Sequence, residues 1–153
     1  MSGVPLGAPK PMIALLARLY APLEPYGYAL IRIAVGAIFM PHGFQKLFGG
    51  GADIIANRVL VGWGLPAPLA WAYGIGMLEF FGGALLALGL FTRPVALLFA
   101  VEMMVSAIGL HSQVWAWNRG GAQYPVFLAV FCLAIVLRGG GRYSLDRRLG
   151  REI

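Results

Sequence analysis

Six ionisable side chains lie in or beside long apolar segments of this 153-residue chain, where charged groups are normally excluded. They are Arg32, His42, Lys46, Glu79, Glu102 and His111. On insertion scales, a charged side chain at the centre of a membrane helix costs about 2.5 to 3.5 kcal/mol, so these groups should face protein or water. Ionisable groups held in such segments can balance one another's charge, relay protons or bind a polar head group.

The expected helix geometry places these groups at successive depths. With a rise of about 1.5 Å per residue, Arg32 lies about 8 Å from one membrane surface, Glu102 about 12 Å, Glu79 about 16 Å and His42 about 22 Å. Lys46 and His111 come near the opposite surface. We therefore expect these residues to form a ladder around one bundle axis, in which Arg32 pairs with Glu102, Glu79 or both.

Two interpretations of this ladder stay open. In the first, the buried charges only neutralise each other and fix the helix register. In the second, they line a polar pocket that opens at the far surface and binds a quinone-like head group or relays protons. A metal site would need three or four ligands, which His42, His111, Glu79 and Glu102 could supply, but their spacing matches no helical metal-binding motif. The sequence therefore predicts no metal.

The composition is that of an integral membrane protein. Apolar residues make up 59% of the chain and charged residues 12%, about half the usual share of a soluble protein. The mean hydropathy is +0.77. The only cysteine is Cys132, so an intrachain disulfide and a thiolate metal cage are both excluded. Five of the twelve basic residues lie in the tail after the last apolar run, so the net charge of +6 fits membrane topology better than a nucleic-acid surface.

The apolar segments predict an all-α fold, a four-helix transmembrane bundle with a short N-terminal interfacial helix. The expected spans cover residues 27–48, 69–91, 94–111 and 124–137, the interfacial helix 12–23, and a short helix or re-entrant loop 52–65. Pro41 should kink the first span or end its regular part. We expect two regions: a tail with the interfacial helix (1–26) and a four-helix membrane domain (27–153).

Small residues predict one close helix contact in the second span. Ala72, Gly76, Glu79, Gly83 and Ala87 recur at helical spacing and share one face. Such a seam lets a neighbouring helix approach closely.

The distribution of basic residues predicts the orientation. With four spans both termini lie on one side, which then carries eight Lys and Arg residues against three on the other, with Arg32 uncounted inside a span. The positive-inside rule therefore predicts cytoplasmic termini, and with them a multi-pass protein of a bacterial or archaeal cytoplasmic membrane.

Four groups of residues occur in an informative order. They are Arg32-x3-Gly36-x2-Phe39-x3-Gly43-x2-Lys46, then Glu79-x2-Gly82-Gly83 leading to Gly89-Leu90-Phe91-Thr92-Arg93, then His111, and finally Gly141-Arg142-Tyr143-Ser144-Leu145-Asp146. In this order the chain resembles the DoxX family of small four-helix membrane proteins, over about residues 28–149. Glu102 lies outside the family pattern, so any role for it rests on its place in the span.

The resemblance implies a redox neighbourhood more firmly than a reaction. DoxX-like proteins are associated with quinone-linked and thiol or sulfur redox systems, usually as partners of other proteins. We therefore expect a subunit or anchor of a membrane oxidoreductase complex, with the lipid bilayer and a protein partner or further copies of itself as its contacts, and no nucleic acid. The alternative is a stand-alone quinone-handling enzyme or a small proton-coupled transporter. Quinone is the cofactor that the resemblance brings into consideration, and the residues by themselves require none.

Overall fold

The computed structural model describes residues 13–150, and within that range every regular element is helical. The α-helices are α1 (Ala14–Tyr20), α2 (Glu24–Phe48), α3 (Gly51–Ile55), α4 (Pro68–Met77), α5 (Gly83–Leu88), α6 (Thr92–Gly109), α7 (Gln123–Arg138) and α8 (Leu145–Arg148). Two π-helical turns, η1 (Ala56–Leu60) and η2 (Leu78–Gly82), and one 3-10 turn, η3 (Trp117–Arg119), complete the list. The all-α prediction is confirmed.

Three helical segments are long and apolar enough to cross a membrane. They are α2, the continuous run of α4, η2 and α5 over Pro68–Leu88, and α6. The fourth, α7, has 16 residues and is shorter than the other three. Each lies within a few residues of its predicted bounds. The helix α2 continues through Pro41 to Phe48, so it does not end there as one of the two expectations held.

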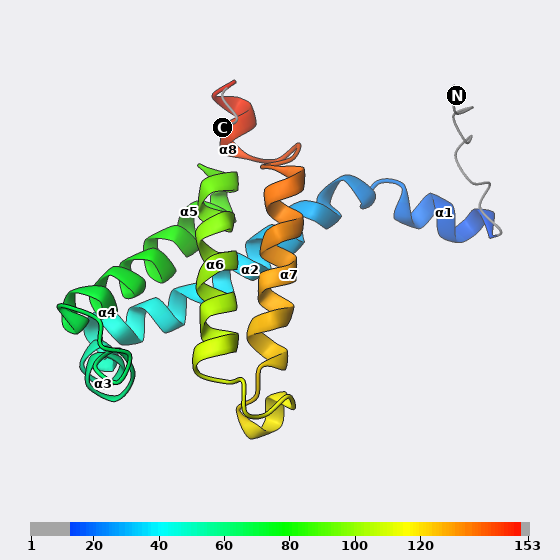
Figure 1. Ribbon diagram of the computed structural model, residues 1–153. Coiled ribbons are helices and arrows are strands. Elements are labelled where there is room, and N and C mark those ends of the chain that lie inside the picture. The colour runs from blue at the N-terminus through cyan, green and yellow to red at the C-terminus, as the bar shows by residue number, and fades with distance from the viewer. Residues whose placement is uncertain (1–12, 151–153) are drawn as a thin grey trace, which may run out of the picture.

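The segments form two antiparallel pairs. Figure 1 shows α6 and α7 side by side, with α2 and the α4–η2–α5 segment crossing them as the second pair. The pairs meet at a core in which the rings of Phe39 and Phe99 stack with centroids 3.8 Å apart. Leu86, Cys132 and Ile135 are buried in the same core. Outside it the spans carry large exposed apolar side chains, such as Ile108 and Leu137, as expected of surfaces covered by lipid.

Glycines allow α2 to lie directly against the second span. A Cβ atom at Gly83 would lie 2.7 Å from the Gly36 carbonyl oxygen and 2.9 Å from Met40 Cγ. A Cβ atom at Gly43 would lie 2.7 Å from the Gly76 carbonyl oxygen. The backbones therefore touch at both points, and the predicted close contact through Gly76 and Gly83 is confirmed.

The segment after α2 folds as α3 and η1, so of the two expectations for 52–65, a short helix or a re-entrant loop, its first part is helical. Its small residues Ala52 and Ala56 are buried together with Leu60 against Ala72 of α4. This packing places η1 beside the N-terminal half of the second span, where it forms one wall of a cavity. The predicted N-terminal helix is present as α1, and residues 1–12 lie outside the described range.

Candidate functional site

A lysine and two glutamates from three helices meet inside the bundle. Lys46 Nζ of α2 lies 2.5 Å from Glu79 Oε2 of η2, in the only ion pair found among residues 13–150. The two side chains are 12% and 5% exposed. Glu102 of α6 completes the group, because its carboxyl group lies beside that of Glu79 and interacts with it. We call these three side chains the Lys46–Glu79–Glu102 cluster.

Local backbone structure brings Lys46 and Glu79 together. Gly43 and Gly76 bring α2 and α4 into backbone contact one turn away, and a Cβ atom at Gly76 would lie only 3.0 Å from Lys46 Cβ. Glu79 itself lies in the π-helical turn η2. A π turn inserts an extra residue into an α-helix and redirects its side chains, and such turns often occur at functional sites.

The cluster contains more carboxyl groups than basic groups. Lys46 donates its short bond to Glu79, whereas Glu102 Oε2 is buried and has no hydrogen-bond partner among the described residues. An unsatisfied buried acceptor costs about 1 to 3 kcal/mol. The cluster can therefore accept a further donor, and its adjacent carboxyl groups are suited to give or take a proton.

Two cavities meet at this cluster. The first has a volume of about 260 Å³ and its polar lining includes His42, His111 and Tyr124. The second has a volume of about 410 Å³ and is mainly apolar, with Trp63 and Trp71 in its wall. Lys46, Glu79, Met103 and Ser106 line both cavities, and Glu102 lines the second. The charged groups thus form the boundary between a cavity of mixed polar and apolar lining and a cavity that is almost wholly apolar.

The two histidines lie at the edge of the cluster. His42 is exposed, and both histidines line the smaller cavity. His111 Nδ1 lies 2.5 Å from the Gly120 carbonyl oxygen, so this ring also ties the loop between α6 and α7 to the end of α6. No group of three or more His, Cys, Asp or Glu side chains within residues 13–150 is arranged to hold a metal ion.

Arg32 does not belong to this cluster, and the prediction that it pairs with Glu102 or Glu79 is wrong. Its guanidinium group donates to three backbone carbonyl oxygens: Ala87 at 3.3 Å, Tyr143 at 2.7 Å, and Gly140. Fourteen residues separate Arg32 from Lys46, which is about 21 Å along α2. Carbonyl groups at helix C-termini carry partial negative charge, and carbonyl groups at the end of α5 and in the chain after α7 bind the two terminal nitrogens of this cation, while its Nε has no partner among the described residues.

Comparisons with known proteins identify the family. The family model described as DoxX matches residues 27–112, more than half of the chain. The chain belongs to the DoxX family. It is 31% identical over 151 residues to inner membrane protein YphA of Escherichia coli (strain K12), covering 93% of this chain and 94% of that protein. It is 28% identical over 134 residues to inner membrane protein YqjF of the same strain, covering 85% and 97%.

The name of a third relative refers to a class of reaction. "Putative oxidoreductase CatD" of Bacillus subtilis (strain 168) is 32% identical over 120 residues, covering 78% of this chain and 84% of that protein. No solved structure gives a significant match. The long apolar helices and the two Escherichia coli relatives make this DoxX protein a multi-pass protein of the bacterial inner membrane.

Apart from His111, most of the motif residues on which the DoxX resemblance rested fall into two structural groups. One group forms the contact face of α2: Gly36 and Gly43 touch the second span, Phe39 stacks in the core, and Lys46 reaches Glu79. The other group fastens the chain after α7 to the turn between α5 and α6. We call this second group the C-terminal clasp and define it by Arg32, Gly89, Gly140, Ser144 and Asp146.

Asp146 belongs to the last motif of the DoxX resemblance, but sequence reasoning gave it no role. Its two carboxylate oxygens accept the backbone N–H groups of Phe91 and Thr92 at 2.8 and 2.9 Å, and its own N–H donates to the Gly89 carbonyl oxygen at 2.9 Å. It therefore caps the N-terminus of α6 from 54 residues away, in the role usually taken by a local side chain. An acidic residue two positions after Ser144 in a basic tail was the available signal.

Gly89 makes room for the buried arginine. Its φ of 72° is in the left-handed region, which ends α5, and a Cβ atom there would lie 2.7 Å from Arg32 Cζ. Arg32 is 1% exposed and occupies the space that a side chain at this position would need. The clasp is thus a structural feature, separate from the Lys46–Glu79–Glu102 cluster.

Proposed function

We propose that this DoxX-family protein is the membrane subunit of a redox-linked oxidoreductase system and binds a lipid-soluble molecule of the quinone class. The observation that carries the proposal is the position of the Lys46–Glu79–Glu102 cluster between a partly polar cavity and an apolar cavity. A quinone combines a polar head with an apolar tail, and it needs both environments at one place. The name of the Bacillus subtilis relative adds support for a redox setting.

The chemistry of the cluster suits a quinone head. The carbonyl oxygens of the quinone head need hydrogen-bond donors. Lys46 carries three N–H groups, of which Glu79 uses one. The free acceptor Glu102 Oε2 suits the hydroxyl group of a reduced head. Together the cavities offer several hundred cubic ångströms, the range found for small-molecule sites. The protein would hold the head group while a partner supplies or removes electrons.

The membrane arrangement that we propose has four spans. The helix α7 has 16 residues and extends about 24 Å, less than the roughly 30 Å apolar core of a bilayer, so flanking residues or local thinning would complete its passage. The exposed apolar side chains of Leu16, Leu19 and Tyr20 suit α1 for the membrane surface. Residues 1–26 would then be a peripheral segment, residues 27–153 the membrane domain, and both termini cytoplasmic.

Binding of a short-chain quinone to the purified protein tests this proposal. Trp63 and Trp71 line the apolar cavity, so a bound quinone should quench their fluorescence in a saturable manner. Lys46→Gln should weaken quinone binding roughly tenfold or more, since a lost hydrogen bond from a charged group is worth about 1.5 to 3 kcal/mol, and Glu102→Gln should weaken binding of the reduced form, whose hydroxyl group donates to the Glu102 carboxyl group. Asp53→Asn changes an exposed carboxylate of α3 and is the matched control.

Two results would count against the site. The first is quenching that rises linearly with quinone concentration, which indicates partition into detergent. The second is equal affinity in the cluster variants and the Asp53→Asn control.

A further inference from the structure

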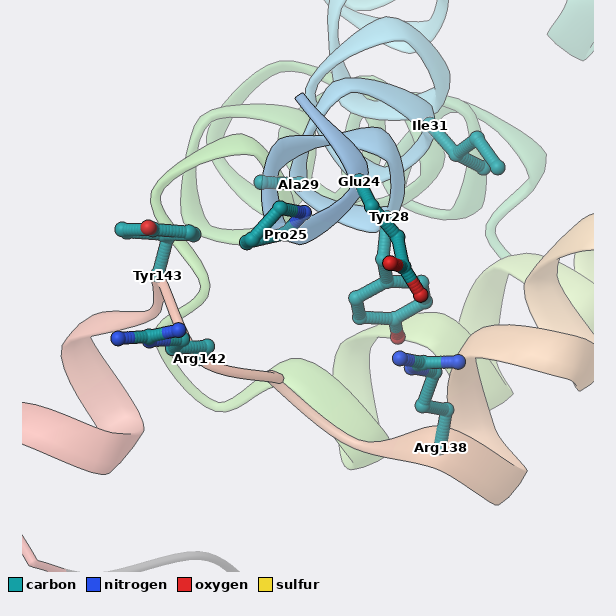
Figure 2. Close-up of a pocket in the computed structure, with 8 residues that line it drawn as sticks. All are labelled: Glu24, Pro25, Tyr28, Ala29, Ile31, Arg138, Arg142 and Tyr143. Carbon is teal, nitrogen blue, oxygen red and sulfur yellow. The ribbon is translucent and has the colours of Figure 1, made fainter. Parts of the chain in front are cut away.

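A second candidate binding site lies at the opposite end of α2 from the cluster. The cavity there has a volume of about 570 Å³ and lies between the start of α2 and the chain that follows α7. Figure 2 shows the guanidinium groups of Arg138 and Arg142 on opposite sides of the open space, with Tyr28 and Glu24 beside the first and Tyr143 above the second. Neither the cluster nor the clasp uses these two arginine side chains.

Both arginines are positioned by aromatic rings. The guanidinium carbon of Arg138 lies 4.5 Å from the centroid of the Tyr28 ring, and that of Arg142 lies 5.8 Å from the centroid of the Tyr143 ring. Stacking uses the flat face of a guanidinium group and leaves its N–H edges available. Among residues 13–150 neither arginine forms an ion pair. With Glu24 as the only acidic group in the lining, the cavity carries one net positive charge.

An apolar groove continues from this cavity along the outside of the bundle. The groove has a volume of about 510 Å³ and shares Tyr28, Ile31 and Arg138 with the cavity above it. Its remaining lining is apolar and comes from α7: Phe131, Ala134, Ile135 and Leu137. From Arg138 to Phe131 is seven residues, about 10 Å along the helix. A short length of hydrocarbon chain fits this groove, and the rest would extend into the bilayer.

We propose that this composite site binds an anionic glycerophospholipid, with the lipid phosphate between Arg138 and Arg142 and one acyl chain in the groove between α2 and α7. Guanidinium groups present paired N–H donors that match phosphate oxygens. Their location at the C-terminal end of α7 places them at the depth where lipid phosphates lie if that helix crosses the membrane. Free phosphate would use the arginines but leave the groove unoccupied. The site is separate from the proposed quinone site and does not depend on it.

Lipid retention by the purified full-length protein, measured by native mass spectrometry, tests the proposal. The probes are phosphatidylglycerol, phosphatidylcholine with the same acyl chains, and inorganic phosphate. We expect wild type to bind phosphatidylglycerol more tightly than phosphatidylcholine, and inorganic phosphate not to compete at equal concentration. Arg142→Gln and Arg138→Gln should each weaken phosphatidylglycerol binding roughly fivefold, the effect typical of one basic group at an anionic surface.

Two further variants separate a built site from general surface charge. Arg147→Gln removes an exposed basic residue of α8 that does not line the cavity, and it should leave lipid binding unchanged. Ala134→Phe should fill the groove and weaken both lipids alike, and because Ala134 is exposed it should not disturb the core. Equal binding of the two lipids, an equal loss in Arg147→Gln, or full competition by inorganic phosphate would each overturn the proposal.

Discussion

The pair formed by Lys46 and Glu79 allows a quantitative prediction about stability. Both side chains are largely buried, and their charged atoms are 2.5 Å apart. Removing one partner of a buried pair strands the other charge, which typically costs about 3 to 5 kcal/mol, whereas removing both partners costs less. Because Lys46 keeps some exposure, we expect Lys46→Met to lower the free energy of unfolding by about 3 kcal/mol, near the lower end of that range.

The double variant distinguishes a specific pair from general polarity. Lys46→Met combined with Glu79→Gln should recover about 2 kcal/mol of this loss, since no unpaired charge of the pair remains. Lys46→Met combined with Glu102→Gln should recover less, because Lys46 bonds to Glu79 and not to Glu102. Unfolding in mixed micelles, followed by circular dichroism, measures these differences. Losses that simply add in the first double variant would refute the pairing as the source of the effect.

Three further predictions concern the fold. Gly83→Leu should destabilise the bundle by about 1 to 3 kcal/mol, because a side chain there meets Gly36 and Met40. A melting temperature in detergent equal to that of wild type would show that the helices can separate at no cost. Asp146→Ala should lower the free energy of unfolding by about 2 to 3 kcal/mol, because it leaves the N–H groups of Phe91 and Thr92 unbonded. Asp146→Asn should lower it less, and equal unfolding midpoints for the two variants would contradict the capping role. A reporter active only in the cytoplasm, fused after Ile153, should be active, and activity of a reporter that requires the periplasm would reverse the proposed orientation.

The sequence predicted the helical segments well because their signal is local. Apolar runs bounded by Gly and Pro mark helix ends directly, and the bounds of α4 to α7 agree with expectation within a few residues. The contact through Gly76 and Gly83 was also predictable, since small residues at helical spacing have one common use in membranes. Both signals are contained in the segment itself.

The partners of the charged residues could not be predicted in the same way. Depth estimates along the spans placed Arg32 next to the glutamates. The structure instead pairs Glu79 with Lys46. Arg32 donates to the carbonyl groups of Ala87, Gly140 and Tyr143. The residue types in a sequence do not show which backbone carbonyl groups will face a buried arginine. An estimated depth also does not give the direction in which the arginine side chain points.

The π turn at Glu79 was equally invisible from the sequence. Nothing in Leu78–Gly82 separates it from an ordinary helical turn. The turn packs against α2 and α6. Only the assembled bundle determines this packing.

The most direct test of the central claim is to map where a photoreactive quinone attaches to the protein in membranes. The proposed site predicts labelled peptides from the cavity wall around the Lys46–Glu79–Glu102 cluster, including Met103 of α6, with labelling prevented by excess unmodified quinone and reduced in Lys46→Gln. Labelling spread along the lipid-facing surfaces of α6 and α7, unaffected by competing quinone and equal in Lys46→Gln, would contradict it.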